Sequence, residues 1–223
     1  MAFTPAQVIA EVRPIINDAG GVRWPDAELL RLTYSAYLEI FAAQPEAFAR
    51  DVGMLCAQGP FQTLDGTFPL GTKLLDIIAN CDANTLPLPG NVERTTRTDL
   101  DRQIPNWATA TASNTTRYWA HDERDPLRFV VYPPRVNASP TEFLLVRVAQ
   151  APSLPTNTSS PAECGDEWQP AVRDYLCGMA MLKDDTFATT PMAGQYLARF
   201  DRAIGIAEGS TESTMRRRDR QEA

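Results

Sequence analysis

The stretch 168-WQPAVRDYLCGMAML-182 decides the fold, because it has the periodicity of an amphipathic helix. The long middle region before it lacks that periodicity. Its apolar residues recur at steps of three and four, so one face of a helix is apolar. A similar pattern runs from Met192 to Ile204, after a turn that ends at Pro191. Two consecutive helices are therefore predicted in this part of the chain.

A second pair of helices is predicted near residue 1. Thr4 and Gln7 form a capping-box pattern, so the first helix is expected over roughly residues 5–18, with a bend at Pro14. The next helix is expected to run over roughly residues 26–44, where apolar residues recur at steps of four, three and four. A short loop containing glycine joins the two, which predicts an antiparallel helical hairpin.

The middle region is rich in proline, threonine and short apolar runs, a texture typical of strands and turns. Asp65-Gly66 within residues 61–70 predicts a β-hairpin with a two-residue turn. Residues 74–78 form a further candidate strand. Residues 128–132 and 143–148 predict a second hairpin.

These elements predict an α+β fold, in which a four-helix layer built from the N- and C-terminal helix pairs carries an inserted β-rich lobe and a flexible C-terminal tail. Each pair of amphipathic helices must bury its apolar face against another element. The simplest solution is that the two pairs pack against each other. The predicted parts are a discontinuous helical domain at 1–50 and 163–208, the lobe at 51–150, a linker at 151–162 and the tail at 209–223.

The composition narrows the class of protein. A chain of 223 residues with 43% apolar and 22% charged residues has an ordinary globular composition. Its net charge of −7 makes the surface as a whole a poor partner for DNA phosphates or an anionic membrane. No long apolar run and no signal-like start occur, so we expect a chain that begins in the cytosol.

No motif in the sequence predicts a catalytic, cofactor or metal site. No glycine-rich phosphate loop is present, and His121 is the only histidine. The cysteines lie singly, without C-x-x-C spacing, which favours four buried free thiols over a metal site; they are Cys56, Cys81, Cys164 and Cys177. An enzyme built on an acid pair such as Asp122 and Asp125 remains a minor alternative.

Two groups of residues are candidates for contacts with partners. The basic run near residue 223 is interpreted either as a solvated tail or as a segment that orders on docking; it contains Arg216, Arg217, Arg218 and Arg220. Trp107 and Trp119 are interpreted first as core residues and second as interface anchors. A carbohydrate-binding module that stacks sugars on Trp107, Tyr118 and Trp119 is a further alternative.

The order of these signals resembles a known family. Residues 17–21, NDAGG, followed by residues 23–30, RWPDAELL, resemble the N-terminal pattern of head-to-tail adaptor proteins of tailed bacteriophages, a group that includes tail tubular protein A. Residues 97–107, RTDLDRQIPNW, and residues 125–134, DPLRFVVYPP, are similar to the middle of such adaptors. The resemblance covers most of residues 5–205.

The resemblance implies a non-enzymatic virion protein at the neck, the junction between portal and tail. Its subunits would form a ring, commonly of twelve, beneath the portal. This ring would join the capsid to the tail and line the DNA channel. The expected partners are the portal protein, tail or nozzle proteins and other copies of the chain. DNA would pass without specific binding, and neither a cofactor nor a membrane is implied.

The same resemblance places the chain in the host cytoplasm during assembly and implies a C-terminal tail that contacts the portal. The family has no fixed arginine motif, so our hypothesis is that the arginines at 216, 217, 218 and 220 make these contacts. We expect a monomer in isolation, with ring formation templated by the portal. Another neck component, a stopper or a tail terminator, is the closest alternative.

Overall fold

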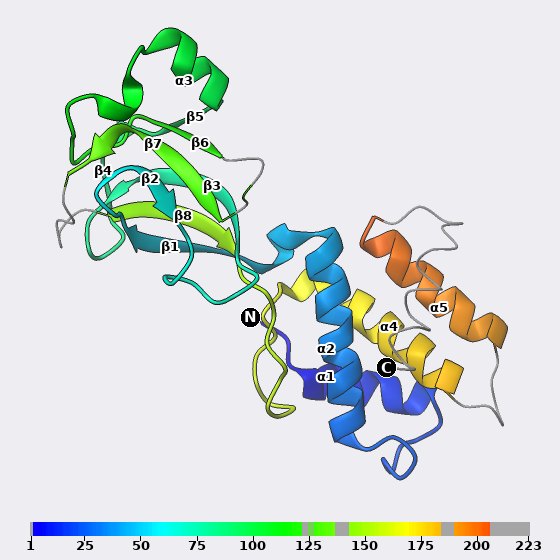
Figure 1. Cartoon of the computed structure of the whole chain (residues 1–223). Helices are drawn as coiled ribbons and strands as arrows, with labels where there is room; N and C mark the ends of the chain where they lie inside the picture. Colours follow the sequence, from blue (N-terminus) through cyan, green and yellow to red (C-terminus); the bar gives the residue numbers. More distant parts are fainter. Residues whose placement is uncertain (1, 122–124, 126, 137–142, 184–189, 206–223) are drawn as a thin grey trace. The chain divides into compact units, whose positions relative to one another are not determined.

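The computed structural model of the chain describes residues 2–121, 125, 127–136, 143–183 and 190–205 (Figure 1). Within these residues the chain forms five α-helices and two four-stranded sheets. Contacts divide it into two compact units, one made of Met1–Ala47 with Pro152–Ala223 and the other of Phe48–Ala151. The first unit is helical and the second holds both sheets, and each is described by itself.

The helical unit begins with the capping box that the sequence predicts. The Gln7 amide donates to Thr4 Oγ1, and the Thr4 amide donates back to Gln7 Oε1 at 2.8 Å, so α1 spans Pro5–Ile15. It ends earlier than expected, because Pro14 lies in its last turn and Asn17 adopts a left-handed φ of 53°. Helix α2 spans Asp26–Ala43, close to its predicted range.

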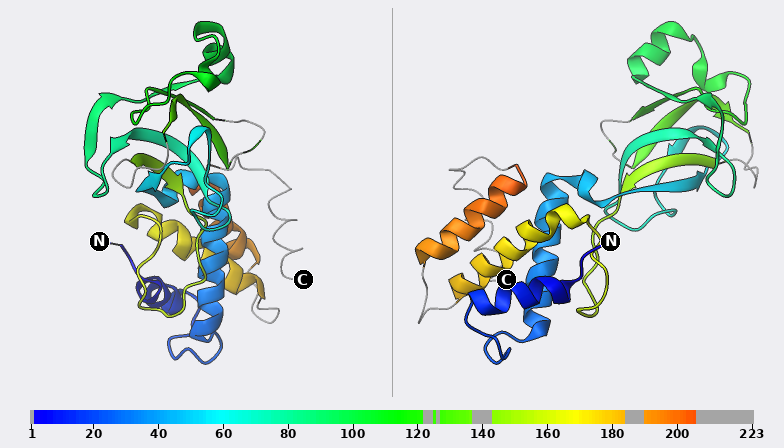
Figure 2. Two further views of the ribbon diagram at one scale, coloured as in Figure 1. Left: turned by 60° about the vertical axis from the view of Figure 1, so that its left-hand side comes forward. Right: turned by 180° about the vertical axis from the view of Figure 1, so that it is seen from behind.

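Helix α4, Gln169–Lys183, is the centre of this unit. Helices α1, α2 and α5 (Thr190–Ala203) all pack against it (Figure 2), and α4 is buried around most of its circumference. The rings of Tyr175 and Phe200 meet edge to face between α4 and α5, with centroids 4.8 Å apart. Between the same two helices, Gly178 lies against the Leu197 side chain.

The expected four-helix layer with an inserted β lobe is therefore wrong. The described residues hold a fifth helix, α3 (Arg97–Gln103), and two separate four-stranded sheets. Helices α1 and α2 also pack more extensively on α4 than on each other. The reason is that α4 carries small and apolar side chains around most of its circumference, so several helices can pack against it. The predicted tail at 209–223 lies outside the described residues.

The second unit pairs its strands across long sequence distances. One sheet has the order β1-β8-β3-β4 and the other β2-β7-β6-β5. Their bounds are β1 Ala49–Leu55, β2 Gly59–Thr63, β3 Lys73–Cys81, β4 Pro87–Asn91, β5 Glu93–Thr95, β6 Tyr118–His121, β7 Arg128–Arg135 and β8 Phe143–Ala149. Adjacent strands are antiparallel except β5 and β6. The register of β1 with β8 sets Ala49 opposite Ala149.

Two apolar clusters stabilise this unit. The larger one draws Met54 and Val146 from one sheet and Trp119 and Phe129 from the other. The smaller one lies on the opposite face of the β2-β7-β6-β5 sheet, where Leu100 of α3 packs with Val130. Alternate residues of β6 and β7 therefore face different clusters, as the two-residue period of a strand requires.

Both predicted hairpins are wrong. Strand β2 pairs with β7 and not with the residues after Gly66, and the Leu64 amide donates to the Leu127 carbonyl. Strands β7 and β8 lie in different sheets. The strand predicted at 74–78 lies within β3. Short 3₁₀ helices span Pro45–Phe48, Trp107–Thr109 and Asp166–Trp168.

Candidate interaction surfaces

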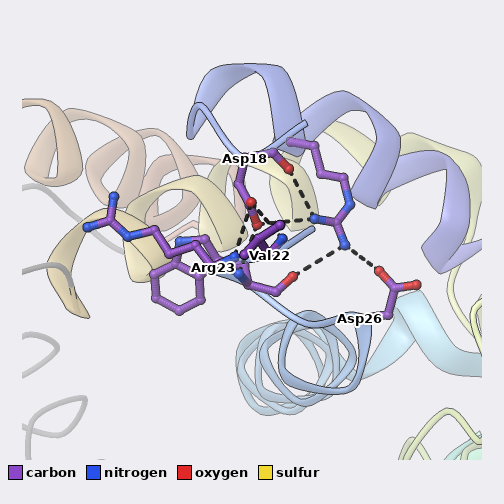
Figure 3. A network of polar contacts seen from close by, with 6 residues as sticks. Asp18, Val22, Arg23 and Asp26 are labelled. Atoms are coloured by element: carbon purple, nitrogen blue, oxygen red, sulfur yellow. Dashed lines mark hydrogen bonds and ion pairs between the residues drawn. The ribbon is translucent and has the colours of Figure 1, made fainter. Parts of the chain in front are cut away.

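The loop between α1 and α2 is organised around one buried carboxylate, that of Asp18 (Figure 3). It accepts backbone hydrogen bonds from Val22 at 2.9 Å, Arg23 at 3.2 Å and Trp24 at 2.8 Å. Burial by itself would raise the pKa of Asp18, but these three amides and the Arg13 guanidinium at 3.2 Å outweigh burial and lower it. The charged carboxylate thus fixes the path of the loop.

Arg13 ties this loop to the start of α2. Besides Asp18, its guanidinium reaches Asp26 Oδ1 at 2.5 Å and the Trp24 carbonyl at 3.3 Å (Figure 3). The buried Trp24 indole lies under the Lys183 ammonium, 4.9 Å from the ring centroid. Lys183 also pairs with Glu28, so α1, α2 and α4 meet at this loop.

Val22 projects from the loop and is 88% exposed. A large aliphatic side chain on a loop that is already ordered loses little entropy when a partner covers it. The loop is therefore a candidate contact surface. The local sequence signal is an aspartate two residues before a Gly-Gly pair. Gly21 has a φ of 66°, and a Cβ there would lie 2.8 Å from the Arg13 guanidinium.

The predicted aromatic anchors are both buried within the β-rich unit. Trp107 is 5% exposed, and its Nε1 donates to Asp101 at 2.7 Å. Trp119 is 1% exposed within the larger apolar cluster, with the Arg94 guanidinium 5.4 Å from its ring centroid. Their interface role remains a prediction. Phe61, which meets the Trp107 ring edge to face at 6.2 Å, is 58% exposed and was not singled out from the sequence.

The three rings suggested for sugar stacking do not form one platform. Trp119 belongs to the larger cluster, whereas Tyr118, its neighbour on β6, packs with Trp107 on the other face of the sheet. Tyr118 itself stacks on Tyr132, with ring centroids 6.3 Å apart. Among the described residues, these three rings therefore do not present one face to a sugar.

The acid pair suggested for catalysis is only partly described. Asp125 accepts a hydrogen bond from the Leu127 amide and pairs with Arg128 at 3.1 Å, as expected for a carboxylate that organises a turn. Asp122 lies outside the described residues, as do the arginines at 216, 217, 218 and 220.

The prediction of four buried free thiols is confirmed. Burial raises the pKa of Cys56 to about 11 and those of Cys164 and Cys177 to about 12, so these thiols stay protonated at neutral pH. Across the described part of the chain, no group of three or more His, Cys, Asp or Glu side chains is arranged to hold a metal ion. The helices described here are also too short or too polar to cross a bilayer.

Comparison with known proteins gives one family-level finding. The family described as SU10 adaptor protein matches residues 3–221 of the chain. No curated protein matches the sequence. The family match spans both units and nearly the whole chain.

Proposed function

Because this chain belongs to the SU10 adaptor protein family, we propose that it joins the portal of a phage capsid to the tail. The resemblance to phage head-to-tail adaptors is confirmed, and the chain is a structural protein of a phage. The proposal adds an arrangement: twelve copies form a ring beneath the portal, at the neck, and line the channel through which DNA passes. The observation that carries it is the family match over residues 3–221.

The charge of the chain supports passage of DNA without specific binding. Each copy carries a net charge of −7, so a ring of copies repels phosphates over most of its surface. DNA binds tightly where Lys and Arg side chains displace the counterions of its phosphates. An acidic channel wall offers few such side chains, so the DNA can slide along it. We propose that partners are bound by local surfaces, among them the loop that carries Val22.

We assign the partners by segment. The helical domain at 1–50 and 163–208 contacts neighbouring copies, and the arginines at 216, 217, 218 and 220 contact the portal, where their guanidinium groups suit carboxylates. The lobe at 51–150 faces the tail or nozzle proteins, and residues 151–162 connect lobe and helices. Assembly takes place in the host cytoplasm and ends in the virion.

Electron microscopy of the chain mixed with purified portal rings tests this function. We expect a collar of twelve copies at the channel exit, and a monomer in sedimentation when the portal is absent. A chain truncated after Glu208 should lose most portal binding at moderate salt. Binding to tail proteins without any binding to portal would contradict the proposal and would indicate a stopper or a tail terminator.

A further inference from the structure

A pocket of about 200 Å³ opens in the helical unit beside α2. Residues 152–163, which we call the strap, form most of its wall. Pro155 and Pro161 of the strap, together with Pro5 and Tyr37, give it apolar sides. Ser153 and Glu163, from the two ends of the strap, supply polar atoms.

The strap is ordered before any partner binds. The Ala6 amide donates to the Thr158 carbonyl at 2.8 Å, and the Ala162 amide donates to the Phe3 carbonyl at 2.7 Å. Within the strap, Asn157 Oδ1 accepts hydrogen bonds from two successive amides, those of residues 159 and 160. A partner that enters the pocket therefore meets a preformed wall.

The Glu163 carboxylate carries a charge that no described cation neutralises. It accepts hydrogen bonds from the Ser153 amide at 3.0 Å and from Ser153 Oγ at 2.5 Å. None of the ion pairs found among the described residues includes it. Each carboxylate oxygen keeps capacity for a further donor.

The size and the walls of the pocket select the occupant. Sites for small molecules commonly measure about 300 Å³ or more, so this pocket suits one side chain. Apolar walls accommodate a methylene stem or a planar guanidinium, and a carboxylate binds a guanidinium through two parallel hydrogen bonds. Arginine supplies 19 of the 21 basic residues of this chain.

We propose that the pocket is a socket for an arginine side chain of a neighbouring copy in the ring. The choice of a neighbouring copy rests on the ring of the proposed function. The choice of arginine rests on the pocket and on the charge of Glu163. Candidate donors are exposed arginines outside any described ion pair, among them Arg97 and Arg102 of α3. The nearby carboxylates of Asp99 and Asp101 accept hydrogen bonds from Thr96 and Trp107 instead.

Amide NMR of the full chain tests the socket without any assembly. The probe is N-acetyl-L-arginine methylamide, and its neutral analogue with citrulline is the matched ligand. We expect saturable shifts at the Ser153 and Thr156 amides with the arginine probe, and affinity about tenfold weaker with citrulline. Glu163→Gln should weaken arginine binding about tenfold. Glu167→Gln removes the same charge from an exposed residue outside the pocket and should change the affinity less than twofold. Equal affinity for the two ligands, or equal effects of the two variants, would overturn the socket.

Ring assembly on purified portal tests the neighbouring copy. We expect Glu163→Gln to raise the concentration needed for a complete ring about tenfold, and Glu167→Gln to leave it unchanged. If Glu163→Gln weakens the arginine probe but rings form at the wild-type concentration, the neighbour is not the donor and the proposal is wrong. If wild-type protein does not bind portal at all, the proposed function and the neighbouring donor both fail, whereas the NMR titration still decides the socket.

Discussion

Two glycines in facing helices predict opposite effects of the same substitution. A Cβ added at Gly178 in α4 would lie 2.7 Å from Leu197 Cγ and 3.2 Å from the Ala193 carbonyl oxygen. A Cβ added at Gly194 in α5 would meet no atom within 4 Å. Gly178→Ala therefore tests the close packing of α4 on α5, and Gly194→Ala is its matched control.

The expected free-energy changes follow from two competing terms. Replacing glycine by alanine inside a helix stabilises the folded state by about 1 kcal/mol, because glycine loses more backbone entropy on folding. At position 194 nothing opposes this gain, so Gly194→Ala should stabilise by about 0.5–1 kcal/mol. At position 178 an overpacking cost of about 1–3 kcal/mol opposes it. Gly178→Ala should therefore destabilise by about 1 kcal/mol.

Urea unfolding followed by circular dichroism at 222 nm measures this difference. The two variants should differ by about 2 kcal/mol, which is about thirtyfold in the folding equilibrium constant. The urea midpoints should rank Gly194→Ala above wild type and wild type above Gly178→Ala, with similar slopes. Gly178→Ala with a midpoint equal to or above that of Gly194→Ala would refute the close approach of α5 to α4.

Three further predictions concern a carboxylate, an indole and the thiols. The folded-state pKa of Asp18 is lowered from 3.8, so its ionised form contributes stability that is present above that value and lost as the pH falls through the lower folded pKa. Asp18→Asn should flatten the fall in unfolding free energy below about pH 4, and an unchanged acid slope in urea titrations would contradict this. Trp107→Phe removes the 2.7 Å bond to Asp101 and should cost about 1 kcal/mol in urea unfolding, whereas an unchanged midpoint would show that solvent replaces the bond. Ellman's reagent near pH 8 should react with almost no thiol in the native chain and with four in guanidinium chloride, since all the cysteines are buried; rapid native labelling would contradict that burial.

Helices near both ends of the sequence could be predicted because their signals are local. The capping pair Thr4 and Gln7 acts across three residues, and the periodicity from Val172 onward lies within one helix. Strand pairing in the other unit is not local. Asp65-Gly66 does lie in a turn, with a φ of 74° at Gly66, yet the preceding strand pairs with β7, because burial in the sheet and not turn geometry selects the partner.

The surfaces were harder to predict than the helices. Asp18 belongs to a recognisable short motif, but its role depends on three amides that only the folded loop brings together. The socket combines Pro5, Tyr37 and Glu163, which are far apart in the sequence, so no spacing points to it. Trp107 and Trp119 stand out by residue type, although both indoles are buried within the unit.

The pairing of Ala49 with Ala149 has an evolutionary consequence. The β-rich unit leaves and re-enters the helical unit at two residues that face each other across neighbouring strands, about 5 Å apart. A short linker can bridge that gap at little cost in chain entropy. A lineage can therefore shorten, enlarge or exchange the whole β-rich unit while the helical framework is retained.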